Sequence, residues 1–196
     1  MIRVLFIRHG KTRGNEEHRY IGRTDEPLSA RGREQAQALH SLDFRPDRLF
    51  VSPMKRTRET ASLAFPGILQ ESVEGLRELD FGLFENRTAE EMWEFPPYQT
   101  WVDSMGLLPI PQGESRDHFM ERTVGAFLST LRGHDPEREE ALFCYVVHGG
   151  SIMAILSRLA RPKRDFYDSQ IKNGSWLLCR LGMDEKGLYL AEISVS

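Results

Sequence analysis

The sequence predicts an α/β fold, a three-layer α/β/α sandwich in which helices cover both faces of a mostly parallel central sheet. First, short apolar runs alternate with helical segments along the chain, which is typical of parallel sheets with crossover helices. Second, residues 141–147 (ALFCYVV) are continuously apolar, as expected of a strand buried on both faces. Third, no linker, repeat or low-complexity segment divides the chain, so we expect a single domain, 1–196.

The N-terminal segment predicts a strand, a loop and a helix. Residues 2–7 (IRVLFI) form a short run of apolar and β-branched side chains, which is typical of a buried strand. The polar stretch 9–27 has no periodicity and is interpreted as a loop. Ser29 is a candidate N-cap for a helix that extends to about Leu39.

A second strand and a second helix follow. Residues 47–51 (DRLFV) predict a short strand. Ser52-Pro53 comes directly after this strand and is typical of a helix start, because serine caps a helix and proline suits its first position. We expect this helix to end near Ala64, before Pro66.

The middle of the chain is the least regular part. Thr88-Ala89-Glu90-Glu91 matches a capping box and predicts a short helix that ends before Pro96-Pro97. Residues 96–113 contain four of the ten prolines, so we expect an irregular excursion there.

The C-terminal half predicts two helices and two further strands. Residues 114–131 place their apolar side chains on one helical face, and residues 151–159 predict another helix. Strands at 175–181 and 187–195, joined by a short turn, predict a hairpin.

Composition and charge exclude several classes of protein. The chain has 26 Lys and Arg against 29 Asp and Glu, a net charge of −3, which argues against a nucleic-acid partner or an anionic membrane surface. No apolar stretch approaches the roughly 20 residues of a membrane span, and no signal segment is recognisable, so we expect a cytoplasmic protein. Cys144 and Cys179 lie in apolar runs and are interpreted as buried, reduced thiols.

Two histidines occupy matching positions in the predicted sheet. His9 follows the first strand as Arg8-His9-Gly10, and His148 follows the run 141–147. Open α/β sheets build ligand sites at the carboxyl ends of their strands. Either histidine alone could simply end its strand, but the pair favours a functional site. No two histidines have the close spacing of a zinc site, so we expect no metal.

Five short blocks occur along the chain in a fixed order. They are LFIRHGKT at 5–12 with Asn15, SPMKRTRETA at 52–61, LRELDFG at 76–82, QGES at 112–115 and VVHGG at 146–150. Together they resemble the histidine phosphatase superfamily, with its phosphoglycerate-mutase-like fold, over about the whole chain. The compact size, the GRTD segment at 22–25 and the LRELDFG block look most like the α-ribazole phosphatase group and its broad-specificity relatives.

The resemblance implies a phosphohistidine mechanism on His9. In this family the first histidine attacks phosphorus, so its attacking nitrogen must be unprotonated. Arg8, from the same block, and Arg56, from the next helix, are the implied cations that lower the pKa of His9 and bind phosphoryl oxygens. His148 is implied to complete the pocket and to stabilise charge in the transferring group.

Further roles are carried over with the blocks. Asn15 and the backbone amide of Gly149 are implied as additional donors to the phosphate. Glu78 is the family-matched acid that protonates the leaving alkoxide, and Asp80 is the fallback because several carboxylates crowd this region. The resemblance implies no cofactor and no metal, because two arginines and a histidine already offset the phosphate charge.

The first block departs from the family pattern and makes its loop basic. Lys11 stands where the family commonly has Glu or Gln, and Gly14 stands where Trp is frequent. Arg13, His18 and Arg23 add further basic side chains. The loop is either a solvated segment or a rim that attracts a second anionic group of the substrate, and in the second case Lys11 and Arg23 bind substrate.

Residues 81–113 are a candidate lid or specificity insertion. Long irregular segments are often functional, and this one carries Trp93, Tyr98, Trp101 and Met105. The alternative is that these side chains form ordinary core packing.

The function implied by the resemblance is a metal-independent phosphomonoesterase that hydrolyses a small phosphorylated metabolite, with a homodimer left open. The alternative in the same pocket is a bisphosphoglycerate-dependent phosphoglycerate mutase. Its members usually carry an insertion between the acid and the second histidine, for which this chain is short. A third alternative is a catalytically silent phosphate-binding regulatory module. Its expected signature is the loss of His9, Arg56 or the acid, and all three are present.

Overall fold

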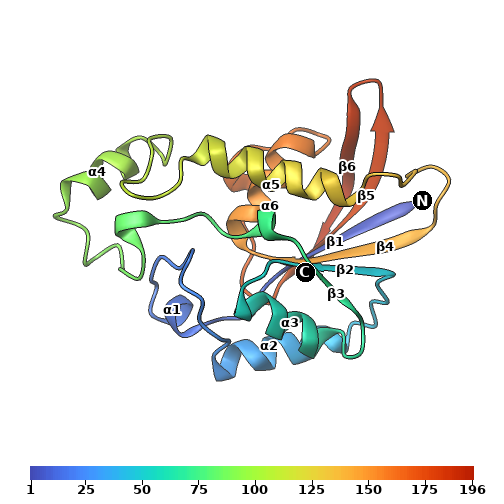
Figure 1. Ribbon diagram of the computed structural model, residues 1–196, viewed down its shortest axis with the longest axis horizontal. Helices are drawn as coiled ribbons and strands as arrows, with labels where there is room; N and C mark the ends of the chain where they lie inside the picture. The colour runs from blue at the N-terminus through green and yellow to red at the C-terminus, as the bar shows by residue number, and fades with distance from the viewer.

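A computed structural model describes residues 1–196, and a six-stranded sheet runs through its centre in the order β3-β2-β4-β1-β5-β6 (Figure 1). The strands are β1 (Ile2–Arg8), β2 (Arg48–Val51), β3 (Gln70–Ser72), β4 (Ala141–Val147), β5 (Trp176–Asp184) and β6 (Gly187–Val195). Strands β3, β2, β4 and β1 pair in parallel, whereas β5 pairs antiparallel with both β1 and β6. The prediction of a mostly parallel α/β sheet is confirmed.

Helices cover both faces of this sheet. They are α1 (Arg13–Glu16), α2 (Ala30–His40), α3 (Lys55–Ala64), α4 (Pro96–Asp103), α5 (Arg116–Thr130) and α6 (Gly149–Leu159), with short 3-10 helices η1 (Glu74–Leu76), η2 (Gly82–Phe84) and η3 (Phe166–Ser169). Helices α2 and α3 pack together on one side of the sheet, and α5 and α6 pack together on the other (Figure 1). None of these helices is both long enough and apolar enough to span a membrane.

The central strand β1 is anchored to both layers. Its Val4 and Phe6 join the core cluster that contains side chains of α5 and α6, whereas Leu5 and Ile7 join the cluster that contains side chains of α2 and α3. All four side chains are fully buried, and each such burial contributes about 1.5–3 kcal/mol to folding. The strand is therefore held from above and below, and so is the residue that follows it, His9.

The predicted start of the helix that follows β2 is wrong. Helix α3 begins at Lys55 with Met54 as its N-cap, and Met54 makes no capping hydrogen bond. Ser52 does not cap this helix, because its Oγ lies 2.8 Å from Nε2 of His148 instead. Local sequence rules assign the Ser52 hydroxyl to the N-terminus of the helix, but in the structure it forms a tertiary hydrogen bond with His148.

The short helix expected after Thr88 is also wrong. The reciprocal bonds of the capping box do form: the Glu91 amide donates to Thr88 Oγ1 and the Thr88 amide to Glu91 Oε2, both at 3.1 Å. They close only a series of turns, and the helix α4 begins at Pro96, where we expected a helix to end. Proline at the first position of a helix loses no hydrogen bond, because amides there have no acceptor within the helix.

The sequence analysis did not predict two of the smaller elements, α1 and β3. Helix α1 lies inside the expected loop 9–27 and is fixed by reciprocal bonds between Thr12 and Asn15. The three-residue edge strand β3 carries no pattern long enough to detect. Cys144 and Cys179 are buried and unpaired, as predicted.

Candidate active site

The two histidines meet at the carboxyl edge of the sheet. His9 follows β1 and His148 follows β4, and these parallel strands are neighbours. The His9 amide donates to the Val147 carbonyl at 3.0 Å, which continues the strand pairing to the edge of the site. The ring centroids of His9 and His148 are 5.2 Å apart, with the rings at 69°. The sheet thus brings together the two histidines that the sequence analysis paired.

His9 is held in a form suited to nucleophilic attack. The side chain is buried, and its Nδ1 lies 2.7 Å from the carbonyl oxygen of Gly10. Because a carbonyl only accepts, Nδ1 carries the proton and Nε2 keeps its lone pair. Burial lowers the pKa of His9 well below its usual value, and the charges of Arg56 and Arg8 lower it further. The imidazole is therefore neutral at physiological pH.

Two arginines, one fully buried and one partly buried, lie beside His9. Arg56 of α3 is fully buried, and its Nη1 and Nη2 donate to the carbonyls of Thr24 and Gly22, both at 2.8 Å. Arg8 donates from Nη1 to the Ile171 carbonyl at 2.6 Å. The Nε atoms of both arginines are buried without a hydrogen-bond partner in the protein.

His148 adds a third buried nitrogen without a partner. Its Nε2 lies 2.8 Å from Ser52 Oγ, and its Nδ1 has no partner in the protein. Burial lowers the pKa of His148 well below its usual value, as does the nearby charge of Arg56. In the neutral ring, a Ser52 hydroxyl that donates to Nε2 leaves Nδ1 as a donor. Arg8, Arg56 and His148 therefore present three buried donors that an anion can satisfy.

Glu78 faces this group from the loop after η1. Its Oε1 accepts from the Leu79 amide at 2.9 Å and its Oε2 from the Gly150 amide at 3.1 Å. Burial raises the pKa of Glu78 above its usual value, against the opposing effect of these two amides and of Arg56. Asp80, the fallback acid, instead accepts from the Gly82 amide and lies 3.5 Å from Arg23. The structure thus places Glu78, and not Asp80, against the first turn of the helix that follows His148.

The close contact between Gly150 and Glu78 yields a test of this placement. A Cβ at Gly150 would lie 2.2 Å from Glu78 Oε1, so Gly150→Ala displaces the carboxyl group. For the phosphomonoesterase activity that the resemblance implies, we expect the rate of alkyl phosphate hydrolysis to fall by about tenfold or more, as misplaced catalytic groups typically show. The matched control is Gly125→Ala in α5, where a Cβ meets nothing within 4 Å. Equal rates for the two variants, measured as phosphate release, would contradict the placement of Glu78.

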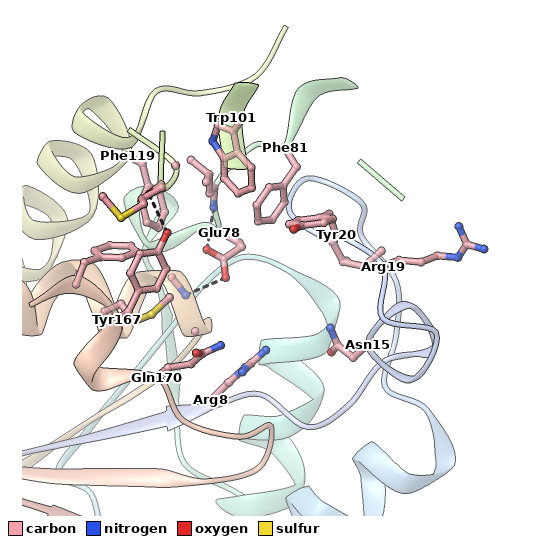
Figure 2. A pocket seen from close by; sticks show the side chains of 18 of the residues that line it. Arg8, Asn15, Arg19, Tyr20, Glu78, Phe81, Trp101, Phe119, Tyr167 and Gln170 are labelled. Carbon is pink, nitrogen blue, oxygen red and sulfur yellow. Dashed lines mark hydrogen bonds between the residues drawn. The ribbon is translucent and has the colours of Figure 1, made fainter. Parts of the chain in front are cut away.

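An aromatic pocket opens beside Glu78. It has a volume of about 480 Å³, and Figure 2 shows Glu78 between the rings of Phe81 and Trp101 on one side and Arg8 on the other. Its aromatic lining comes from five separate parts of the chain: Tyr20, Phe81, Trp101, Phe119, and the adjacent Phe166 and Tyr167. The Tyr167 hydroxyl donates to the Met105 carbonyl at 3.3 Å and so links the segment after α4 to η3 (Figure 2).

Residues 81–113, the candidate lid, divide between core packing and the lining of the aromatic pocket. Tyr98 is buried in a small core cluster with Phe84 and Met92. Trp101 and Met105 line the aromatic pocket, whereas Trp93 is 67% exposed. One part of the segment therefore packs as core, and another part forms a wall of the pocket.

The remaining predicted residues separate into three groups. Asn15 lines the aromatic pocket, and its Oδ1 accepts from the Thr12 amide and from Asn173 Nδ2, both at 3.2 Å, which leaves its own Nδ2 to donate. Gly149 also lines the pocket, as the first residue of α6. Lys11 lines a second hollow next to the first. Arg23 lines neither of these hollows, and its assignment to substrate binding stays a prediction.

Sequence reasoning missed several residues at this site. Ser52 holds His148, and its position directly after β2 at the same edge of the sheet was the signal that could have identified it. Asn173 donates to the His9 carbonyl at 3.1 Å, but nothing in its local sequence marks it. No group of three or more His, Cys, Asp or Glu side chains is arranged to hold a metal ion.

Comparison with known proteins identifies a family and relatives to which this chain is similar. The model of the histidine phosphatase superfamily (branch 1) matches residues 4–194. A probable phosphoglycerate mutase, GpmB, of Escherichia coli O1:K1 / APEC is 32% identical, over 81% of this chain and 75% of the relative.

Solved structures show the same likeness. A putative alpha-ribazole-5'-P phosphatase from Escherichia coli K-12 superimposes with a TM-score of 0.81 at 26% identity, covering 96% of this chain and 94% of that one. The alpha-ribazole phosphatase from Shigella flexneri has a TM-score of 0.79 at 26% identity, with the same coverage. TTHB049 from Thermus thermophilus has a TM-score of 0.70 at 29% identity, covering 96% of each chain.

Proposed function

Because the chain belongs to the histidine phosphatase superfamily, we propose that it is a metal-independent phosphomonoesterase that acts on a small phosphorylated metabolite through a phosphohistidine on His9. The observation that carries this proposal is the set of three buried, unpartnered nitrogens, on Arg8, Arg56 and His148, beside a neutral His9. Each buried donor without a partner costs about 1–3 kcal/mol, and three phosphoryl oxygens are suited to satisfy them.

The first step of the proposed reaction transfers the phosphoryl group to the protein. Nε2 of His9 attacks phosphorus, the bond from phosphorus to the ester oxygen breaks, and protonated Glu78 gives its proton to the leaving alkoxide. Arg8, Arg56 and His148 hold the three other phosphoryl oxygens and offset the charge that develops on them. The raised pKa of Glu78 favours the protonated form that this step requires.

The second step releases phosphate. The carboxylate of Glu78 removes a proton from water, the water oxygen attacks phosphorus, and the bond from phosphorus to His9 breaks. Glu78 is then protonated again and His9 is neutral, so both groups return to their starting states. One carboxyl group therefore serves as the acid in the first step and as the base in the second.

The aromatic pocket supports a leaving group with a planar, apolar body. The pocket lies next to Glu78, where the leaving oxygen must receive its proton, and six aromatic side chains line it. Two of the structural neighbours carry the name of alpha-ribazole phosphatases. α-Ribazole 5'-phosphate is therefore the first substrate to assay, together with the generic substrate 4-nitrophenyl phosphate.

Mutase activity is the second candidate, and the relatives named probable phosphoglycerate mutase favour it. A mutase passes the phosphoryl group of phosphohistidine to a second substrate rather than to water. Phosphate release and transfer between phosphoglycerates, scored separately with and without a bisphosphoglycerate primer, distinguish the two. Transfer that depends on the primer, without net phosphate release, would overturn the proposal of a phosphatase.

Chelation tests the proposal that the protein's own cations suffice. Arg8, Arg56 and His148 supply charge and donors to the phosphoryl oxygens, so we expect treatment with a chelator to leave phosphate release from 4-nitrophenyl phosphate unchanged. The measurement compares steady-state rates before and after chelation and after addition of divalent cations. A rate that falls on chelation and returns with one cation would contradict the metal-independent mechanism.

A further inference from the structure

A second hollow, here called the basic groove, adjoins the aromatic pocket. Its volume is about 610 Å³, and Arg8, Asn15, Arg19 and Gln170 line both hollows. Unlike the aromatic pocket, the groove has a polar lining with a single hydrophobic residue. Its lining includes five cations and no carboxylate: Arg8, Lys11, Arg19, Arg31 and Lys172.

Four of the five cations of the groove form no ion pair within the protein. Among the five, only Arg19 forms ion pairs, with Glu17 and Glu91. Lys11, Arg31 and Lys172 form none, although the chain as a whole carries three more acidic than basic residues. Like charges gathered around one hollow repel each other and raise the local concentration of anions. The groove is therefore an attractive position for an anionic group.

Hydrogen bonds hold the groove in a fixed relation to His9. Gln35 of α2 accepts from the Lys11 amide and donates to the Asn173 carbonyl, both at 2.9 Å. Asn173 in turn donates to the carbonyl of His9 at 3.1 Å. The segments that carry Lys11 and Lys172 are thus tied to one helix and to the nucleophile. A ligand that bridges the groove and His9 meets groups that are already positioned, which lowers the entropic cost of binding.

We propose that the basic groove binds a second phosphate group of the substrate, whose first phosphate is transferred to His9. This inference rests on the proposed function only for the placement of that first phosphate. The substrate class is then a phosphomonoester whose leaving group carries an apolar body for the aromatic pocket and a further phosphate for the groove. Arg31 and Lys172 determine the specificity for this second phosphate, and Arg8 stands at the border between the two positions. A phosphate fits better than a carboxylate because its three oxygens can engage several cations at once.

The test uses ligands that cannot be hydrolysed. The probes are alkane bisphosphonates of graded chain length and alkyl monophosphonates of the same lengths, titrated into the full chain by calorimetry. At one chain length we expect the bisphosphonate to bind roughly tenfold more tightly than its monophosphonate partner, as for a charge-assisted contact. The variant with both Arg31→Gln and Lys172→Gln should lose this advantage. Lys186→Gln, an exposed lysine in the turn between β5 and β6, is the matched control and should keep it.

The outcomes separate the groove from the proposed reaction. An equal affinity for the two ligands at every chain length would overturn the inference, and so would an advantage that persists in the double variant. The far-ultraviolet spectrum and melting temperature of the double variant establish that it is folded. A bisphosphonate advantage that the double variant loses supports the groove even if no phosphomonoester is hydrolysed. That last result would remove the proposed function and leave the groove as a binding site.

Discussion

His9→Ala is expected to reduce phosphate release from 4-nitrophenyl phosphate by about 10⁴-fold or more, while the fold persists. The side chain supplies the only proposed nucleophile, and loss of a covalent nucleophile typically removes most of the catalysed rate. The fold should persist because β1 is anchored by Val4, Leu5, Phe6 and Ile7, none of which is changed. The measurements are the steady-state rate and the melting temperature.

The matched control for this variant is His40→Ala. His40 is an exposed histidine at the end of α2, and its only side-chain hydrogen bond joins Nδ1 to the Ala64 carbonyl. Its rate should equal that of the unmodified protein. Acid-labile label from a phosphoester should appear on the unmodified protein and on the control, and not on His9→Ala. Undiminished hydrolysis by His9→Ala would overturn the phosphohistidine mechanism.

Glu78→Gln is expected to slow hydrolysis of alkyl phosphates by about 10²–10⁴-fold, the usual contribution of a general acid. An alkoxide leaves poorly unless it is protonated, whereas 4-nitrophenolate leaves without a proton. With 4-nitrophenyl phosphate the variant should therefore release its first equivalent of nitrophenol rapidly and then slow down, because water activation also requires Glu78. Rapid-mixing measurements detect this burst. Asp80→Asn, which changes the fallback acid, should leave both rates near those of the unmodified protein.

The pH dependence of the proposed reaction follows from the pKa shifts of His9 and Glu78. The pKa of His9 is lowered, so its productive neutral form is lost only when the pH falls well below the usual histidine range. The pKa of Glu78 is raised, so its productive protonated form is lost as the pH rises above the usual range of a carboxyl group. We expect a bell-shaped profile of kcat/KM for an alkyl phosphate. Its alkaline limb should disappear in Glu78→Gln, and a limb that is unchanged in this variant would assign it to another group.

Much of the fold could be predicted because its strands are strongly apolar. The runs at 2–7 and 141–147 form β1 and β4 almost residue for residue, and their burial on both faces leaves no other assignment. The middle of the chain could not be predicted from local rules. Around Thr88 and Pro96 the expected capping and helix-breaking signals compete with packing of Met92 and Tyr98 into a separate small core. Local conformational propensities contribute only about 1 kcal/mol, which is less than the free energy gained by burying such side chains.

In the site, too, some residues could be predicted from the local sequence, whereas others are placed only by tertiary contacts. His9 and His148 could be placed because each ends a recognisable strand, and the topology brings these strands together. The role of Asn173 could not be predicted, because it acts through a hydrogen bond to a residue more than ninety positions away and nothing in its local sequence marks it. Ser52 also acts through such a hydrogen bond, and only its position directly after β2 could have indicated its role. The basic groove is also tertiary, since Lys11, Arg31 and Lys172 come from three separate segments.

Arg56 has a consequence for how binding and loop order depend on each other. Two of its guanidinium nitrogens donate to the Gly22 and Thr24 carbonyls, and the third, Nε, is buried without a partner in the protein and is one of the proposed phosphoryl donors. A phosphoryl group that fixes this guanidinium also fixes the loop, and by thermodynamic linkage an ordered loop tightens phosphate binding by the same factor. Phosphate should therefore slow amide hydrogen exchange at residues 22–24. Substitutions that loosen this loop, although remote from phosphorus, should weaken phosphate binding in proportion.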